Sequence, residues 1–175
     1  MKGAEDFGRA LIAEAERRLL AESLPRLERC LSLLTEEEIW QRPNAATPSV
    51  GNLILHLCGN VRQWIVAALG GAPDVRRRAE EFNPTDPIPA DELRARLTAT
   101  LRQAHETLRR LDPASLLEKR PVQGFEETGI AILVHVVEHF SYHVGQISFR
   151  VKTLHGVDLG YYAGQDLNRT RGSGG

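Results

Sequence analysis

Three histidines spaced four residues apart form the clearest chemical pattern in the chain. They are His135, His139 and His143, in the segment HVVEHFSYHVGQ that ends at Gln146. Residues four apart on an α-helix differ by only about 40° around its axis, so the three imidazoles follow one another along one face. Two imidazoles at this spacing can bind the same metal ion. The segment therefore predicts a helix that presents a pair of histidine ligands, with ordinary hydrogen-bonded histidines as the alternative.

A second polar stripe lies in a segment that otherwise has the composition of a buried helix. Within residues 52–68, the helix face centred on His56 also carries Asn60, Gln63 and Trp64. A buried polar group without a partner costs about 1 to 3 kcal/mol. A metal ion held between this helix and the later histidine helix would give His56 a partner. A hydrogen bond to a backbone carbonyl is the alternative.

Helical periodicity dominates the chain and predicts an all-α domain that positions these side chains. We expect four long helices, at residues 4–34, 49–69, 91–111 and 128–154. Pro25 should kink the first of them, and Ser49 is the expected N-cap of the second. Thr35 and Glu38 have the spacing of a capping box for a short intervening helix. The first half of the last helix is apolar on every side, so we expect it to be the most buried.

The connection between the second and third long helices determines the expected topology. Residues 70–90 contain four prolines, and a connection of about 20 residues can span the length of a bundle helix when extended. A tight turn between antiparallel neighbours needs far fewer residues. We therefore expect a four-helix bundle of up-down-down-up order with a long crossover. One domain over residues 1–170 and a disordered tail at residues 171–175 complete the expected organisation.

Charge and composition exclude several classes of function. Lys and Arg total 22 against 23 for Asp and Glu, and the net charge of -1 gives no field that attracts nucleic acid or an anionic membrane. The longest wholly apolar stretch, residues 130–134, is far too short to span a membrane. The N-terminus lacks the apolar core of a signal peptide, so we expect a cytoplasmic protein. Cys30 and Cys58 should be reduced core thiols.

The sequence resembles the DinB-like superfamily of metal-binding four-helix bundles, in particular its small uncharacterised bacterial members. The resemblance covers residues 9–150, and its most specific part is a histidine in the second helix followed much later by His-x-x-x-His-x-x-Gln. The matching segments are WQRPN at 40–44, GNLILHLCGNVRQWI at 51–65 and HVVEHFSYHVGQ at 135–146. The resemblance implies that His56, His139 and His143 bind one divalent metal ion and that the bundle has the up-down-down-up order.

Directions around the last helix favour His139 and His143 over His135 as its two ligands. His139 and His143 share the centre of one face, whereas His135 lies at a flank, where we expect a packing or supporting role, with a ligand role as the alternative. Three imidazoles leave at least one coordination position open, as in catalytic zinc sites. Zinc or nickel suits these donors best, and iron or manganese with added waters is compatible with them. His105 and His155 are expected to be solvated.

Six further residues are expected near the metal, as hydrogen-bond partners of the ligands or as part of a substrate pocket. They are Asn60, Gln63, Gln146, Tyr142, Glu138 and Arg42. Glu138 points about 100° away from His139 around the helix, which favours a structural or interfacial carboxylate over a general base. Arg42 could bind a substrate carboxylate, although fixing its own loop is the commoner role of such an arginine. No residue is assigned as catalytic.

The resemblance leaves two classes of function open. Characterised members of the superfamily include transferases and isomerases that use low-molecular-weight thiols such as bacillithiol or mycothiol. This implies a metal-dependent thiol S-transferase or a related small-molecule enzyme, hydrolase-like chemistry included. The alternative is a non-catalytic, stress-related bundle that binds a metal or another ligand. The resemblance also implies a homodimer formed through helix faces. A ferritin-like di-iron site is excluded, because no histidine has a glutamate three residues before it.

Overall fold

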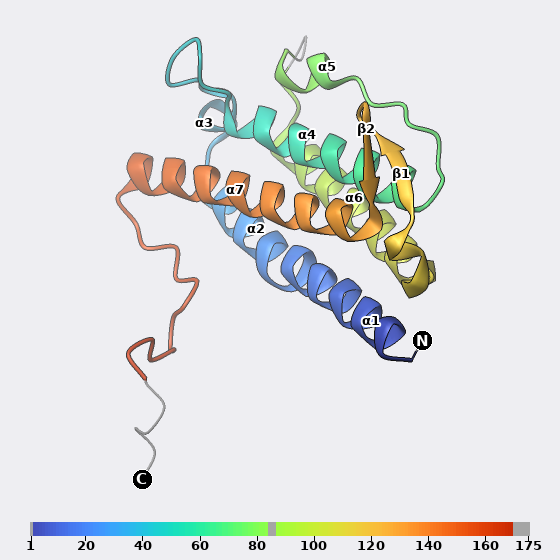
Figure 1. Ribbon diagram of the computed structural model, residues 1–175. Helices are drawn as coiled ribbons and strands as arrows, with labels where there is room; N and C mark the ends of the chain where they lie inside the picture. The colour runs from blue at the N-terminus through green and yellow to red at the C-terminus, as the bar shows by residue number, and fades with distance from the viewer. Residues whose placement is uncertain (1, 84–86, 170–175) are drawn as a thin grey trace.

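The computed structural model describes residues 2–83 and 87–169, and most of them are helical (Figure 1). The expected tail at residues 171–175 lies outside the described residues. The helical elements are α1 (Lys2–Glu16), η1 (Arg17–Ser23), α2 (Leu24–Leu33), α3 (Glu36–Trp40), α4 (Val50–Val61), η2 (Arg62–Leu69), α5 (Arg78–Phe82), α6 (Ala90–Arg110), η3 (Pro113–Leu117) and α7 (Gly129–His155). Two strands, β1 (Lys119–Val122) and β2 (Phe125–Thr128), precede α7.

Side-chain caps fix where the helices begin and end. The Ser49 side chain accepts a hydrogen bond from the backbone of Asn52, and the Asn52 side chain accepts one in return, so the expected N-cap of α4 is confirmed. The capping box that opens α3 at Thr35 is confirmed as well. Thr128 caps the start of α7, and Gly156, with φ of 62°, ends it. These caps determine where α4 begins and where α7 begins and ends, and these are the two helices that carry the histidines.

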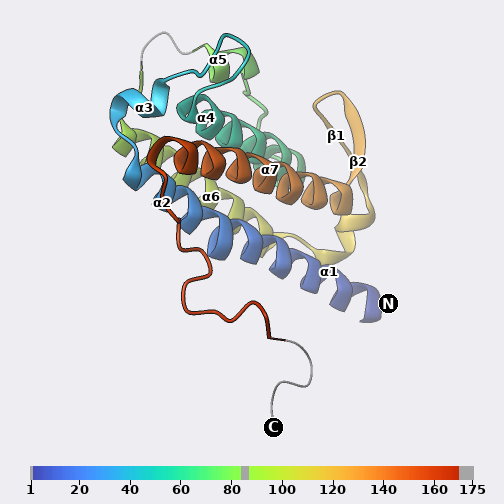
Figure 2. The same ribbon diagram turned by 90° about the vertical axis from the view of Figure 1, so that its left-hand side faces the viewer.

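The helices α4 and α6 run in the same direction. At their beginnings, the Trp40 ring packs against Gly51, and its Nε1 donates to the carbonyl of Ile88 over 3.0 Å. Near their ends, Gly70 packs against Thr107. The connection between them therefore runs from the end of η2 back to the level at which α4 begins. In both views α7 lies beside α4, with α1 and α2 on its other side (Figures 1 and 2).

A π-helical segment, η1, interrupts the expected first helix directly before Pro25. Proline lacks an N–H donor, and its ring clashes with the carbonyl four residues earlier. The wider π-helical turn accommodates this clash without ending the helix. A change of helix type thus lies next to the position where the kink was expected.

The all-α expectation missed the hairpin formed by β1 and β2. The strands pair antiparallel from Lys119 with Thr128 to Val122 with Phe125. Gln123 and Gly124, with φ of 51° and 84°, form the turn. Strands of four residues are too short to show a clear alternation in the sequence.

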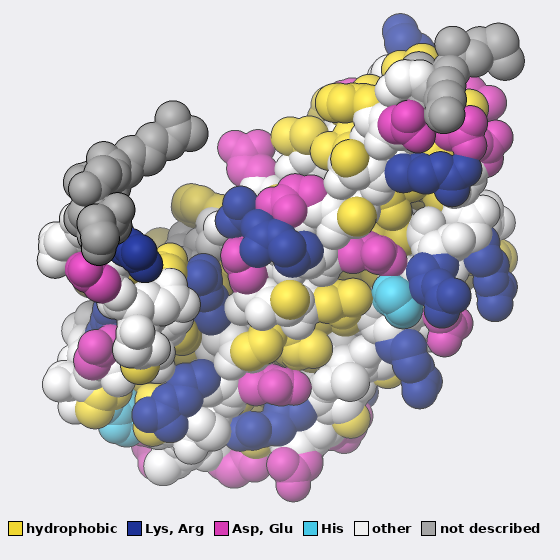
Figure 3. Space-filling view, turned by 90° about the horizontal axis from the view of Figure 1, so that it is seen from below, with side chains coloured by type: hydrophobic (Ala, Val, Ile, Leu, Met, Phe, Trp, Pro, Cys, Tyr) yellow, Lys and Arg dark blue, Asp and Glu magenta, His cyan; other side chains and the backbone are white. Residues whose placement is uncertain are grey.

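The expectation that α7 is the most buried helix was wrong, because ten of the 12 residues of α4 are buried, against nine of the 27 residues of α7. Val134, Tyr142 and Phe149 are exposed, whereas the opposite face of α7 packs on α2 and α4. Cys30 and Cys58 are buried free thiols, as expected. Basic, acidic and apolar side chains are interspersed on the face seen in Figure 3. Within residues 2–83 and 87–169, no helix is long and apolar enough to cross a membrane.

Candidate metal centre

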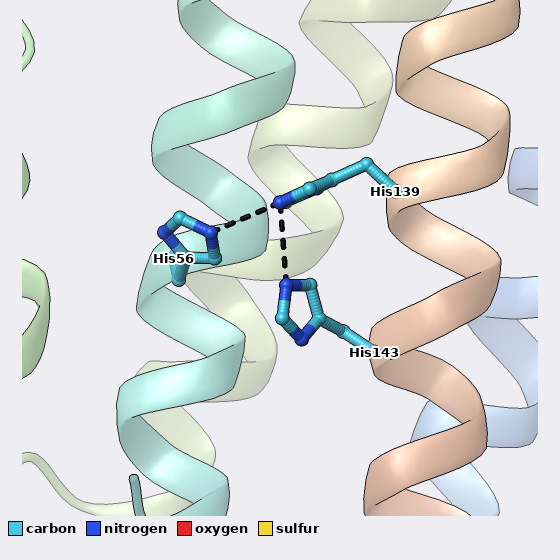
Figure 4. Close-up of side chains that lie close together, drawn as sticks. All are labelled: His56, His139 and His143. Atoms are coloured by element: carbon cyan, nitrogen blue, oxygen red, sulfur yellow. Dashed lines mark hydrogen bonds between the residues drawn. The ribbon is translucent and has the colours of Figure 1, made fainter.

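Three imidazoles from two helices meet between α4 and α7 (Figure 4). His56 comes from α4, and His139 and His143 come from successive turns of α7. The Nε2 atom of His139 lies 3.0 Å from Nε2 of His56 and 3.2 Å from Nε2 of His143. One nitrogen from each ring lies within 4.8 Å of the other two, so the group could hold a metal ion.

The contacts made by the Nδ1 atoms of His56 and His143 leave the Nε2 atoms of these two rings suited to bind a cation. His56 Nδ1 lies 2.8 Å from Glu81 Oε2, and His143 Nδ1 lies 2.8 Å from Gln146 Oε1. Each oxygen is an acceptor, which favours a proton on Nδ1 of each neutral ring and a free lone pair on Nε2. At His56 the guanidinium of Arg76 also approaches Nδ1, with Nη2 at 3.2 Å, so the carboxylate of Glu81 and a donor group face the same nitrogen. If His139 carries its proton on Nε2, that proton can form a hydrogen bond with the lone pair of His56 or of His143, but not with both. A metal ion between the rings could bind both lone pairs.

The distances also fit a metal ion. Tetrahedral zinc with Zn–N bonds of about 2.0 to 2.1 Å holds its nitrogen ligands about 3.3 Å apart. The two Nε2–Nε2 distances of 3.0 and 3.2 Å are close to that value. Two of the three nitrogen pairs thus have the spacing of ligands on one ion, the third lies within 4.8 Å, and the donor chemistry suits a divalent ion.

Burial keeps the rings on α7 unprotonated. It lowers the pKa of His139 to about 3, and the neighbouring His143 and His56 rings lower it further. Burial also lowers the pKa of His143. Metal ions compete with protons for imidazole nitrogen, so rings that are neutral near pH 7 are ready to bind. Within the described part of the chain, His139 Nδ1 is buried without a hydrogen-bond partner.

A buried carboxylate that sequence reasoning missed supports His56. Glu81 lies in α5, and its oxygens accept hydrogen bonds from Arg76 Nε over 2.7 Å and from Arg76 Nη2 over 2.9 Å. Burial by itself would raise the pKa of Glu81, but hydrogen bonds from Arg76 and His56 lower it below its usual value. Glu81 lies in the proline-containing connection, where no helical period links it to His56. The signal that could have pointed to it is Gly59, one of two glycines in α4.

The expected supporting residues are distributed unevenly around the three histidines. Gln146 contacts a ligand ring directly, through His143 Nδ1. The ring of Tyr142 lies edge-on to that of His143, with 5.0 Å between centroids, and is largely exposed. Glu138 is exposed on α7, and its side chain lies outside the three-histidine group. Of these residues, Gln146 is therefore the one that holds a ligand ring in place.

The hydrogen bonds found for the remaining expected residues go to groups other than the three ligand rings. Asn60 is buried and bonds to His135 over 3.2 Å. Gln63 accepts a hydrogen bond from Arg76 over 2.8 Å and so buttresses the pair of Arg76 and Glu81. Arg42 donates to Asn52 Oδ1 over 3.1 Å and to the carbonyl of Phe82. Arg42 thus fixes its loop to the start of α4 and the end of α5.

His135 lies beside the three-histidine group. Its ring stacks on Trp64 with centroids 3.7 Å apart, and its Nε2 faces Asn60. The described residues that could hold a metal together are His56, His139 and His143, without His135. This position accords with a packing or supporting role.

His155 is exposed and His105 is partly exposed, in line with the expectation that both are solvated, but each ring also contacts a carboxylate. His105 Nδ1 lies 2.9 Å from Glu16, and His155 Nε2 lies 3.3 Å from Glu38. His155 is the last residue of α7 rather than a residue beyond it. Each imidazole meets a carboxylate from a helix distant in the sequence, which the sequence periodicity does not reveal.

Comparison with known proteins identifies a family. The model of the DinB superfamily matches residues 19–147, which include all three histidines and both supporting residues, Glu81 and Gln146. No curated protein matches the chain.

Proposed function

This chain belongs to the DinB superfamily, and from that premise we propose that it binds one divalent metal ion through His56, His139 and His143. The observation that carries the proposal is the convergence of three Nε2 atoms from two helices at 3.0 and 3.2 Å. Zinc or nickel is the proposed ion, because both suit imidazole nitrogen. Iron or manganese, with added water ligands, would use the same donors.

We further propose that the metal serves a transfer reaction on a small molecule. A bound divalent ion lowers the pKa of a coordinated thiol or water and so supplies a nucleophile near neutral pH. Three protein ligands leave a position for that molecule. The family resemblance favours a low-molecular-weight thiol of the bacillithiol or mycothiol type, which would be transferred to an electrophilic carbon. The competing function is non-catalytic, with the ion only linking α4 to α7.

Elemental analysis of protein purified without a histidine tag tests metal binding. We expect about one divalent ion per chain, and saturable rebinding of zinc or nickel after chelation. A panel of thiols with an electrophilic substrate should then show turnover that depends on the metal. Absence of both retained metal and saturable binding would refute the proposed site. Full metal loading without turnover across the panel would support the non-catalytic function.

We also propose the family's up-down-down-up bundle for the four long helical segments, within one domain over residues 1–170. The segments are α1 to α2, α4 to η2, α6 and α7. The shared direction of α4 and α6 supports this order, because parallel neighbours require the long connection that joins them.

A homodimer formed through the exposed face of α7 completes the proposed function. Val134, Tyr142 and Phe149 are 51%, 62% and 73% exposed and fall within about 80° of one another around the helix. Gly145 lies in the same stripe, and a Cβ there would have nothing within 4 Å. Exposed apolar side chains gathered on one helix face favour contact with another surface, which is the reason for proposing the interface here.

Charges on the stripe favour a second copy of this chain as the partner. Glu138 and Lys152 are exposed on the same face, seven residues before and seven residues after Gly145. Two copies of α7 packed antiparallel about a two-fold axis at Gly145 would therefore place Glu138 opposite Lys152 of the partner subunit. The stripe is thus complementary to itself, as a two-fold interface requires.

The variant Phe149→Asp should convert the dimer to a monomer, because it places a carboxylate in the apolar stripe. Light scattering coupled to size-exclusion chromatography measures the change. Phe125→Asp is the matched control, since Phe125 is also exposed, at 57%, but lies in β2. A wild-type protein that is monomeric at every concentration, or a Phe149→Asp variant that stays dimeric, would contradict the proposed interface.

A further inference from the structure

We propose that Glu81 is a positioning residue for the metal centre, which fixes the tautomer of His56 and raises the affinity of the site for its ion. This inference rests on the proposed metal binding. Glu81 belongs to the connection between α4 and α6 rather than to either helix that carries the three histidines. Through Glu81, the connection between α4 and α6 would orient one of the three ligands, His56.

The contacts of Glu81 leave its carboxylate little freedom. One oxygen accepts from His56 Nδ1 over 2.8 Å, and Arg76 donates to both oxygens over 2.7 and 2.9 Å. The side chains of His56, Glu81 and Arg76 are 8%, 9% and 5% exposed. The backbone carbonyl of Glu81 also accepts a hydrogen bond from Asn52 Nδ2 over 3.1 Å. Hydrogen bonds to the carboxylate and to the backbone carbonyl therefore both hold Glu81 in place.

This arrangement distinguishes His56 from the other two histidines. The Nδ1 atom of His143 meets a neutral amide oxygen of Gln146. Within the described residues, Nδ1 of His139 meets no hydrogen-bond partner at all. Among the contacts of the described residues, His56 is the one of the three with an anion on its outer nitrogen, at 2.8 Å, and Arg76 Nη2 lies farther from that nitrogen, at 3.2 Å. A carboxylate in this position holds the proton on Nδ1, directs the Nε2 lone pair towards the metal and makes the imidazole a stronger donor.

The placement of a charged pair here is poorly explained by stability alone. Removing a carboxylate and a guanidinium from water costs several kcal/mol for each ion, so a buried ion pair often contributes little to folding. The helix also leaves space for this pair at Gly59, where a Cβ would lie 1.9 Å from Glu81 Oε1. Room is thus kept in α4 for a carboxylate whose other oxygen, Oε2, faces a histidine of the proposed site.

The variant Glu81→Gln tests the proposal, because it keeps the shape of the side chain and removes its charge. We expect zinc affinity, measured by competition with a chelator at fixed pH, to fall about 10- to 100-fold. The matched control is Glu80→Gln, since Glu80 is the neighbouring residue on α5 but pairs with the exposed Arg77. Glu80→Gln should bind zinc as wild type does. Equal affinities for wild type and a folded Glu81→Gln variant would overturn the proposal while leaving metal binding intact.

A spectroscopic measurement on the metal-free wild type tests the same proposal without any variant. Nitrogen-15 chemical shifts of the histidine rings should show His56 with its proton on Nδ1 and with Nε2 unprotonated. In Glu81→Ala, which removes the acceptor, the Nε2-protonated tautomer should become populated. A wild-type His56 protonated on Nε2 would overturn the role of Glu81, whatever the protein's activity. Failure of wild type to bind zinc at all, with the expected tautomer present, would count against the proposed function alone.

Discussion

Replacing His139 with alanine should remove the metal from the protein, whereas replacing His135 with alanine should leave about one ion per chain. His139 Nε2 lies between the other two ligand nitrogens, at 3.0 Å from one and 3.2 Å from the other. Two nitrogens would remain in His139→Ala, which is too few for a tight zinc site. His135 instead stacks on Trp64, so its loss removes packing and leaves the three ligands in place.

Thermal unfolding gives this prediction a second measurement. A ligand that binds only the folded state stabilises it by about 2.7 kcal/mol at a free concentration one hundred times its Kd. Zinc added to chelated wild type or to His135→Ala should therefore raise Tm, and zinc added to His139→Ala should not. Circular dichroism before heating shows whether each variant is folded. Metal retained by a folded His139→Ala, or lost from a folded His135→Ala, would mean that the ligands are assigned wrongly.

Replacing Gly59 with alanine should destabilise the protein by about 2 to 4 kcal/mol, although alanine favours helices more than glycine does. The new Cβ would lie 1.9 Å from Glu81 Oε1 and 3.0 Å from Arg76 Nε. It would therefore push apart a buried ion pair whose partners cannot reach water without moving the connection that carries them. Urea unfolding measures the change in free energy.

A double-mutant cycle identifies the cause of that loss. In a Glu81→Ala background the contested space is empty, so Gly59→Ala should be close to neutral there. Gly59→Ala in the wild-type background should also weaken zinc binding, because Glu81 moves away from His56. If Gly59→Ala costs the same free energy in both backgrounds, the clash with Glu81 is not its cause.

Local periodicity was sufficient to predict the parts of the site that lie on one helix. His139, His143 and Gln146 are spaced so that any α-helix brings them to one face. The structure places the first two rings against each other and the amide of the third on His143. The capping boxes at Thr35 and Ser49 were predictable for the same reason, since each depends on residues three apart. The family is also evident from these segments, and the match over residues 19–147 confirms it.

Interactions between distant segments were harder to predict. A polar stripe around His56 indicated that it needed a partner, but the stripe did not identify which of its amides would contact a ligand. Asn60 contacts His135, and Gln63 contacts Arg76. The hairpin was missed because its pairing and its bond from Trp64 Nε1 to Gln123 are not features of either strand alone.

The sequence by itself therefore determined the four long helical segments, the caps at Thr35 and Ser49, the family and the three candidate metal ligands. Each of these depends on spacing within one segment or on a motif recognisable in one dimension. Only the tertiary structure decided that Glu81, held by Arg76, occupies the outer nitrogen of His56. It also decided that one face of α7 stays exposed. Both depend on how the connection and the helices pack in space, because burial and contact between distant residues leave no period in the sequence.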